Sequence, residues 1–141
     1  NQFQERKAKK TYIAIVSGTP KIPEAMIDLP IGRNPKIPSS FRVDAKGKSA
    51  QTHYKVLGSK AGRSVIELKP ITGRTHQLRV HLAHLGTPIV GDTLYDGKKS
   101  PIGRMCLHAQ SLEITIPGSV RKTFTAPLPP DMQELVDDIC A

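Results

Sequence analysis

The hydrophobic pattern of the first half of the chain predicts several strands. Residues 11–16 (TYIAIV) are apolar or β-branched, and a Gly-Thr-Pro segment ends the run soon after. Residues 51–57 and 63–69 are two more strand-like runs, and the segment 58–62 between them predicts the turn of a hairpin. Residues 21–40 contain four prolines, which predict an irregular arm without regular structure.

The stretch 72–85 predicts the one internal helix, with Thr72 or Thr75 as its N-cap. A glycine follows this stretch and a proline comes two residues later, in the order that commonly ends helices. The apolar stripe of this helix consists of leucines spaced i, i+4 and i+7: Leu78, Leu82 and Leu85.

The C-terminal third predicts a second hairpin and a short helix. In residues 112–116 apolar and polar side chains alternate as in a half-buried strand, and the Pro-Gly pair at 117–118 predicts a turn toward residues 121–125. Asp131 is expected to cap a short terminal helix. The apolar residues of that helix are Met132, Leu135, Val136 and Ile139.

Length and composition fit one globular domain. The chain has 141 residues, 38% of them apolar and 23% charged, which supports a core and argues against disorder. No run approaches the roughly 18 apolar residues of a membrane span. Because hairpins dominate and helices are few, we expect residues 1–141 to form a single α+β domain. Its mixed, mainly antiparallel sheet would carry one internal helix and a short C-terminal helix.

Charge and cysteine content indicate a polyanionic partner and a reducing compartment. The chain has 21 lysines and arginines against 12 acidic residues, a net charge of +9. Such a surplus favours binding to phosphate backbones, because binding releases their counterions. A merely soluble basic protein is the alternative. Cys106 and Cys140 lie outside any CxxC motif and are read as reduced thiols, so we expect a cytoplasmic location.

Candidate chemistry is concentrated in residues 69–92 (KPITGRTHQLRVHLAHLGTPIVGD). A glycine-containing loop leads there into the predicted helix, whose first turns carry Arg74, His76 and Arg79. Helix N-termini attract anions, and a guanidinium binds carboxylate or phosphate through paired hydrogen bonds. His76 and Arg79, three residues apart, share a face. An anion site and a solvated basic helix start both fit this spacing.

Metal, nucleophilic-cysteine and nucleotide-cofactor chemistry are not supported by the motifs. His81 and His84 are neighbours on the predicted helix, but His76 faces elsewhere, and neither HExxH nor a carboxylate completes a ligand set. Cys106 has His108 two residues away but no third group to orient it. No P-loop or GxGxxG motif is present.

Residues 73–92 resemble the most recognisable motif of the RluA-type pseudouridine synthases, in the form GRTHQLRVHLAHLG-x-PIVGD. Residues 10–14 (KTYIA) are similar to the K-x-Y-x-A strand of that family. Further stretches agree in the expected order: 27–32, 47–50, 104–112 and 124–127. The resemblance implies a pseudouridine synthase catalytic fold and an isomerase that converts uridine to pseudouridine in ribosomal or transfer RNA. It implies neither a metal nor an organic cofactor.

The resemblance also implies roles for individual residues. Arg79 matches the arginine that pairs with the catalytic aspartate, and such a pair keeps the carboxylate ionised. Tyr12 matches the tyrosine that stacks on the target uracil, a task that suits a flat phenol ring. The substrate-binding residues that it suggests are Arg74 and His76, toward the RNA backbone or the pocket, with Lys69 and Leu78, the last as an apolar wall for the base.

The nucleophile motif of the family, HRLD-x-x-TSG, is not found in these residues. It precedes the K-x-Y strand in the family, whereas the nine residues before Lys10 include no aspartate, and Asp44 is read as a loop residue. The chain thus resembles the C-terminal half of the catalytic domain. We expect its partners to be RNA and the N-terminal half of the same protein, and we expect no turnover by the chain alone. A non-catalytic RNA-binding module is the alternative, and an HRLD-type motif upstream in the same reading frame would decide between them.

Overall fold

A six-stranded sheet forms the body of the molecule. The computed structural model describes residues 8–116 and 120–141. The strand order is β2-β5-β6-β1-β7-β8, and every pair of neighbours is antiparallel. The bounds are β1 (Ala8–Ser17), β2 (Glu24–Asp28), β5 (Gln51–Lys60), β6 (Arg63–Pro70), β7 (Leu107–Ile116) and β8 (Val120–Thr125). A small hairpin of β3 (Ile31–Arg33) and β4 (Phe41–Val43) lies beside this sheet.

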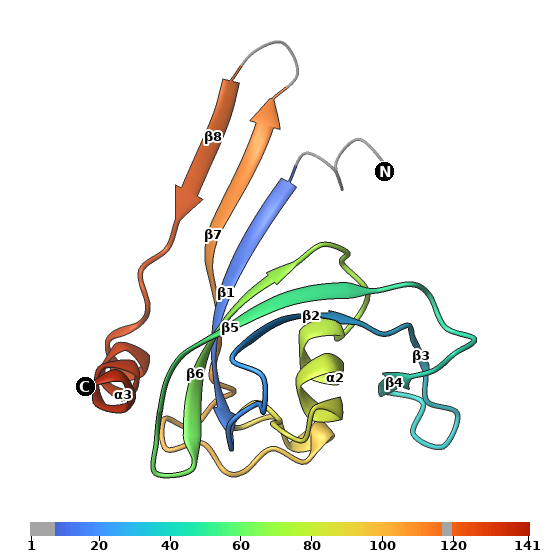
Figure 1. The fold of residues 1–141 in the computed structure, drawn as a ribbon, viewed down its shortest axis with the longest axis horizontal. Helices are drawn as coiled ribbons and strands as arrows, with labels where there is room; N and C mark the ends of the chain where they lie inside the picture. The colour runs from blue at the N-terminus through green and yellow to red at the C-terminus, as the bar shows by residue number, and fades with distance from the viewer. Residues whose placement is uncertain (1–7, 117–119) are drawn as a thin grey trace.

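Two helices cover opposite faces of the sheet (Figure 1). Side chains of β1 alternate between them: Ala14 and Val16 share a core cluster with α2 (Gln77–His84), whereas Ile13 and Ile15 share one with α3 (Pro130–Cys140). Both faces of β1 are therefore buried, which explains why its sequence is a continuous apolar run rather than a clean alternation. The α+β fold with an antiparallel sheet, one internal helix and a C-terminal helix is confirmed.

The arm predicted to be irregular contains two strands, so that prediction was wrong. Its prolines at 23 and 30 flank β2 instead of interrupting it, and β2 pairs with β5 at one edge of the sheet. The Pro23 carbonyl even accepts a hydrogen bond from the Val56 amide, at 2.7 Å. Proline is tolerated at the ends of an edge strand because no neighbouring strand requires its missing N–H.

The hairpin of β5 and β6 is longer and tighter than predicted. The strands extend to Lys60 and resume at Arg63, so only Ala61 and Gly62 form the turn, with φ of 54° and 78°. Positive φ at both central positions matches the right-handed twist of the flanking strands. Segment 58–62 is therefore mostly strand, and its glycine at 58 serves packing instead. A Cβ there would lie 2.8 Å from the Sγ of Cys140 on α3.

The internal helix begins later than predicted and without a threonine cap. It runs from Gln77, and the N-cap residue is His76, in the left-handed conformation with φ 56°. The Thr72 hydroxyl instead donates to the side-chain oxygen of Gln77, at 2.7 Å. Leu78 and Leu82 are buried as expected, but Leu85 follows the helix and is 38% exposed.

The C-terminal elements agree with the sequence prediction except for the helix cap. The predicted turn at 117–118 lies outside the described residues. Pro129 occupies the N-cap of α3, and the Asp131 carboxylate instead accepts two hydrogen bonds from Arg104, at 2.6 and 2.7 Å. Met132 and Ile139 are buried against the sheet as predicted. Among the described residues, no helix is both long and apolar enough to cross a membrane.

Candidate functional site

Arg79 and Asp92 form the most enclosed ion pair of the described residues. Arg79 Nε and Nη2 each donate to one carboxylate oxygen of Asp92, both at 2.9 Å. The Asp92 side chain is 1% exposed and that of Arg79 23%. The hydrogen bonds to Asp92 raise the pKa of Arg79 above its ordinary value. Within the described residues Arg79 therefore pairs with an aspartate of this chain. Its pairing with the catalytic aspartate of the family stays a prediction.

The backbone before Asp92 explains how this acid reaches the helix. Val90 N donates to the Ile15 carbonyl at 2.9 Å, which anchors this segment beside β1. Gly91 follows with φ 89°, and a Cβ there would lie 2.7 Å from the Arg104 carbonyl oxygen. Only glycine fits such a position, so the Gly-Asp pair turns the chain and directs the carboxylate inward.

Tyr95 connects Arg79 with His76. It ends the short 3₁₀ helix η1 (Thr93–Tyr95), and the guanidinium carbon of Arg79 lies 5.1 Å from its ring centroid. The Tyr95 hydroxyl accepts a hydrogen bond from the Phe41 amide at 2.9 Å and lies 2.6 Å from His76 Nδ1. The rings of His76 and Phe41 also meet edge to face, with centroids 5.4 Å apart.

The contacts of His76 favour its uncharged form. Its Nδ1 shares a hydrogen bond with the Tyr95 hydroxyl, which also accepts from the Phe41 amide. Burial and the positive charge of Arg79 lower the pKa of His76 below its ordinary value. His76 is therefore a neutral imidazole at neutral pH.

Gln77 and His81 form a buried polar network beneath the start of α2. The Gln77 side-chain amide donates to Thr52 Oγ1 at 2.9 Å, and the Thr52 hydroxyl is 2.9 Å from His81 Nδ1. His81 Nε2 donates to the Leu29 carbonyl at 2.9 Å. The Gln77 oxygen accepts from the Arg74 amide at 3.0 Å. The network thus holds the loop that carries Arg74.

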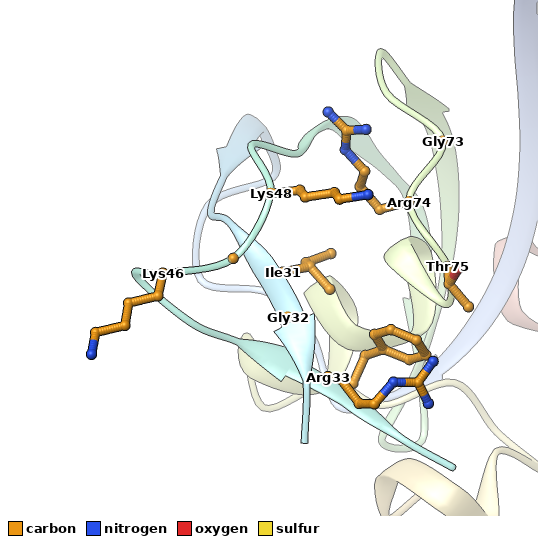
Figure 2. A pocket seen from close by; sticks show the side chains of 10 residues that line it. Ile31, Gly32, Arg33, Lys46, Lys48, Gly73, Arg74 and Thr75 are labelled. Atoms are coloured by element: carbon orange, nitrogen blue, oxygen red, sulfur yellow. The ribbon is translucent and has the colours of Figure 1, made fainter. Parts of the chain in front are cut away.

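A cavity of about 370 Å³ lies between the β3–β4 hairpin and the loop before α2 (Figure 2). We call it the arm pocket. Its lining residues are Ile31, Gly32, Arg33, Phe41, Lys46, Gly47, Lys48, Gly73, Arg74 and Thr75. Arg74 Nε donates to the Ser49 carbonyl at 2.8 Å, which fixes its guanidinium at the rim. Phe41 connects this pocket to the site of Arg79, because its amide donates to Tyr95.

The structure brings only some of the sequence-predicted residues together. Arg79 and His76 meet through Tyr95, while Arg74 lines the adjoining pocket. Tyr12 is half-buried and packs against the same core cluster as Leu78, which is 8% exposed. No described interaction joins Tyr12 to Arg79.

Lys69 is placed apart from the other predicted residues. It is exposed on β6, next to Leu68, whose side chain belongs to the core cluster on the α2 face. Because successive strand residues point to opposite faces, Lys69 lies on the face opposite to Tyr12 and α2. Its ammonium is 3.9 Å from Glu67 on the same strand.

Within the described part of the chain, no group of three or more His, Cys, Asp or Glu side chains is placed to hold a metal ion. Both ring nitrogens of His81 are engaged, with Thr52 and Leu29. Cys106 is buried, Cys140 is exposed, and both are free. Burial raises the pKa of the Cys106 thiol, which keeps it protonated and a poor nucleophile.

Sequence reasoning missed Asp92, Tyr95 and Phe41 as members of the site. Asp92 lies within the family-like motif but had no assigned role, and Tyr95 follows it by three residues. Both come from an irregular segment, where no hydrophobic period indicates which way a side chain points. One sequence signal for Asp92 was available: it directly follows Gly91, which ends the apolar residues Ile89 and Val90.

A model of the RNA pseudouridylate synthase family matches residues 1–84. An uncharacterized RNA pseudouridine synthase of Chloroflexus aurantiacus is 46% identical over 137 residues, which are 94% of this chain and 43% of that protein. The dual-specificity RNA pseudouridine synthase RluA of Escherichia coli K12 is 44% identical over 131 residues, which are 89% of this chain and 60% of that protein.

A solved structure is similar as well. Human RNA pseudouridylate synthase domain containing 1 superposes with a TM-score of 0.73 at 30% identity, covering 97% of this chain and 67% of the human one. The chain therefore spans about half of the length of the curated relatives above, and nearly all of it takes part in the match.

Proposed function

The chain belongs to the RNA pseudouridylate synthase family, and from this membership we propose that it forms part of an isomerase converting uridine to pseudouridine in ribosomal or transfer RNA. In this reaction the uracil leaves the ribose through N1 and reattaches through C5. It is redox-neutral, and the leaving group is also the attacking group. The single observation that carries the proposal is the match of residues 1–84 to the family model, and the Arg79–Asp92 pair adds the geometry of one predicted site residue.

Arg79 still has donors for a second carboxylate. A guanidinium carries five N–H donors, and Asp92 accepts from Nε and Nη2 only. Among the described residues nothing accepts from Nη1. We propose that Nη1 of Arg79 pairs with the nucleophilic aspartate of an HRLD-type motif. Asp92 is then a positioning residue, because it holds the guanidinium of Arg79 in the required orientation. A second charge-assisted pair would keep the nucleophile ionised.

Tyr12 and His76 are the proposed contacts with the target base. The half-buried Tyr12 ring would stack on the uracil. Leu78, which belongs to the core cluster against which Tyr12 packs, would form an apolar wall beside the base. The other ring nitrogen of His76, Nε2, has no partner among the described residues and would form a hydrogen bond with the base or with the adjoining backbone. A uracil within a helix must be flipped out to reach these groups. Lys69, on the opposite sheet face, would contact RNA only at a distance from them.

Arg74 is proposed to contact the RNA backbone and not the reacting base. Its Nε is held by the Ser49 carbonyl, and Arg74 lines the rim of the arm pocket with its terminal nitrogens free of described partners and available to a phosphate. We further propose that residues 1–141 act as one domain together with the N-terminal half of a catalytic domain. The two free cysteines fit the cytoplasmic location proposed for it.

The test is pseudouridine formation by the complete gene product that carries this chain. Arg79→Ala is expected to lower turnover at least a thousandfold, about 4 kcal/mol, because the nucleophile loses its partner. Tyr12→Ala is expected to lower it strongly and Tyr12→Phe less, since phenylalanine keeps the stacking face. Turnover that stays within threefold of wild type in Arg79→Ala would refute the role of Arg79.

One observation favours a second candidate function, an RNA-binding module without activity. The arm pocket is lined by cationic side chains, and binding RNA there requires no nucleophile. Sequencing the reading frame upstream discriminates the two. A frame that holds an HRLD-type aspartate supports the enzyme, and a frame without one supports the module.

A further inference from the structure

The arm pocket concentrates positive charge without an acidic counterpart. Four of its ten lining residues are cationic: Arg33, Lys46, Lys48 and Arg74. Within residues 8–116 and 120–141, none of the four forms an ion pair, and no carboxylate lines the cavity. A Cβ at Gly32 would lie 3.3 Å from the carboxylate of Asp44, but this carboxylate is 3.7 Å from Arg42 and also accepts from the Lys46 amide. Such a cluster of like charges favours an anionic ligand.

The orientation of the side chains selects which cations serve the cavity. Figure 2 shows Lys48 running toward Arg74 across the rim, whereas Lys46 extends away from the cavity. Arg74 is fixed by the Ser49 carbonyl. Lys48 and Arg74 thus line the same rim of the pocket, and one of the two is held in place, which suits the binding of a phosphodiester oxygen.

The opposite side of the pocket offers a planar surface. The Arg33 guanidinium carbon lies 4.8 Å from the centroid of the Phe41 ring, and Nη1 donates to the Pro38 carbonyl at 2.6 Å. The guanidinium is thus stacked and held in place while the Arg33 side chain stays exposed. Unpaired RNA bases stack on aromatic rings and on guanidinium planes.

We propose that the arm pocket binds one unpaired nucleotide of the RNA next to the target uridine, with its phosphate between Lys48 and Arg74 and its base on Arg33. The volume of about 370 Å³ lies within the usual range for small-ligand sites. The pocket adjoins Arg79 through Phe41 and Tyr95, so its ligand is a neighbour of the reacting nucleotide. This inference rests on the proposed function, since it names a further part of the same substrate.

The test uses the complete gene product and a short single-stranded oligouridylate, with affinity measured by fluorescence anisotropy as a function of salt. Lys48→Gln is expected to weaken binding about fivefold and to lower the log–log salt slope by about 0.7, the value for one phosphate contact on a single strand. Lys48→Arg is expected to restore both. Lys46→Gln removes the same charge from a side chain that extends away from the cavity, and Lys60→Gln removes it from the far end of β5. Both should change the slope much less.

The base position is tested with Arg33→Lys, which keeps the charge and removes the plane. Binding of oligouridylate is expected to weaken about fivefold, while binding of an abasic oligomer of the same length stays unchanged. An equal loss with both oligomers would overturn the placement of the base. A Lys48→Gln slope equal to that of Lys60→Gln would overturn the phosphate site.

Pseudouridine formation by the same preparations separates this inference from the proposed function. If wild type converts uridine but the pocket variants keep its KM and salt slope, the pocket proposal fails and the function stands. If wild type converts nothing although Lys48→Gln lowers the slope, the pocket stands and the enzymatic function fails.

Discussion

At the scale of single residues, the site depends on polar groups whose partners come from distant parts of the chain. Arg79 was identified from the sequence, and its need for a carboxylate was expected from the family. Asp92 lies thirteen residues further on, across a helix end and a loop, so no periodicity connects the two. Tyr95 likewise meets His76 only because η1 folds back beside α2. Residue types could be predicted from the sequence, but their pairing required the fold.

Removing the carboxylate of Asp92 tests the enclosed ion pair. Asp92→Asn is expected to lower the free energy of unfolding by about 3 kcal/mol, because it leaves the partly buried Arg79 charge unpaired. Asp131→Asn is the matched control, since Asp131 also accepts two hydrogen bonds from an arginine, Arg104, but on the surface. The control should lose much less, owing to solvent screening. Equal losses of unfolding free energy for the two variants, measured by urea unfolding, would contradict the view that the Arg79–Asp92 pair is shielded from solvent.

The buried imidazole of His81 predicts acid sensitivity. Burial lowers the pKa of His81 below its ordinary value, whereas the unfolded chain retains a pKa near 6.5. As the pH falls through about 6.5, His81 therefore becomes protonated in the unfolded state while it stays neutral in the folded state. This contribution to stability is complete above that pH and declines between it and the lower folded pKa. His76 acts in the same direction.

Urea unfolding at about pH 7.5 and about pH 5.5 measures this effect. Wild type is expected to be less stable at the lower pH. His81→Gln, which keeps one donor and one acceptor without a titrating ring, should show a smaller decrease. A decrease of the same size in this variant would assign the acid sensitivity to other groups.

At the scale of elements, the strands and helices that bury a continuous or periodic apolar face could be predicted from the sequence. The strand β1 and the buried side of α3 agree with their patterns. The arm was mispredicted because proline was taken to forbid strands, although its prolines flank β2 instead of interrupting it. The start of α2 was misplaced because Thr72 binds the Gln77 side chain instead of capping the helix. Tertiary contacts decide such boundaries, and the local sequence does not contain them.

Two glycines that line the arm pocket are expected to differ sharply in how much a substitution by alanine destabilises the protein. A Cβ at Gly47 would overlap the carbonyl carbon and oxygen of Ile31, whereas a Cβ at Gly73 would meet nothing within 4 Å. Gly47→Ala is expected to destabilise the protein by about 2 kcal/mol and to weaken RNA binding, because backbone atoms must shift. Gly73→Ala should stay within about 0.5 kcal/mol of wild type. Similar urea midpoints for both variants would contradict the close packing of the 44–48 turn on β3.

At the scale of the whole molecule, the net charge of +9 is compatible with a polyanionic partner, although a merely soluble basic protein has the same balance. The fold shows where part of that charge lies. Arg33, Lys48 and Arg74 come from three separate segments of the chain and line one cavity. Charge composition alone could not predict the position of this cavity.

Pseudouridine formation on one uridine-containing RNA, detected by mass spectrometry, tests whether this chain supplies only part of an active site. It compares the complete gene product with the purified 141-residue chain, whose folding is checked by circular dichroism and by salt-dependent RNA binding. We expect pseudouridine from the complete product and none from the 141 residues, because Arg79 and Tyr12 cannot replace the carboxylate nucleophile. Pseudouridine made by the 141-residue chain alone, or none made by a complete product that contains an HRLD-type aspartate, would contradict this division of the site.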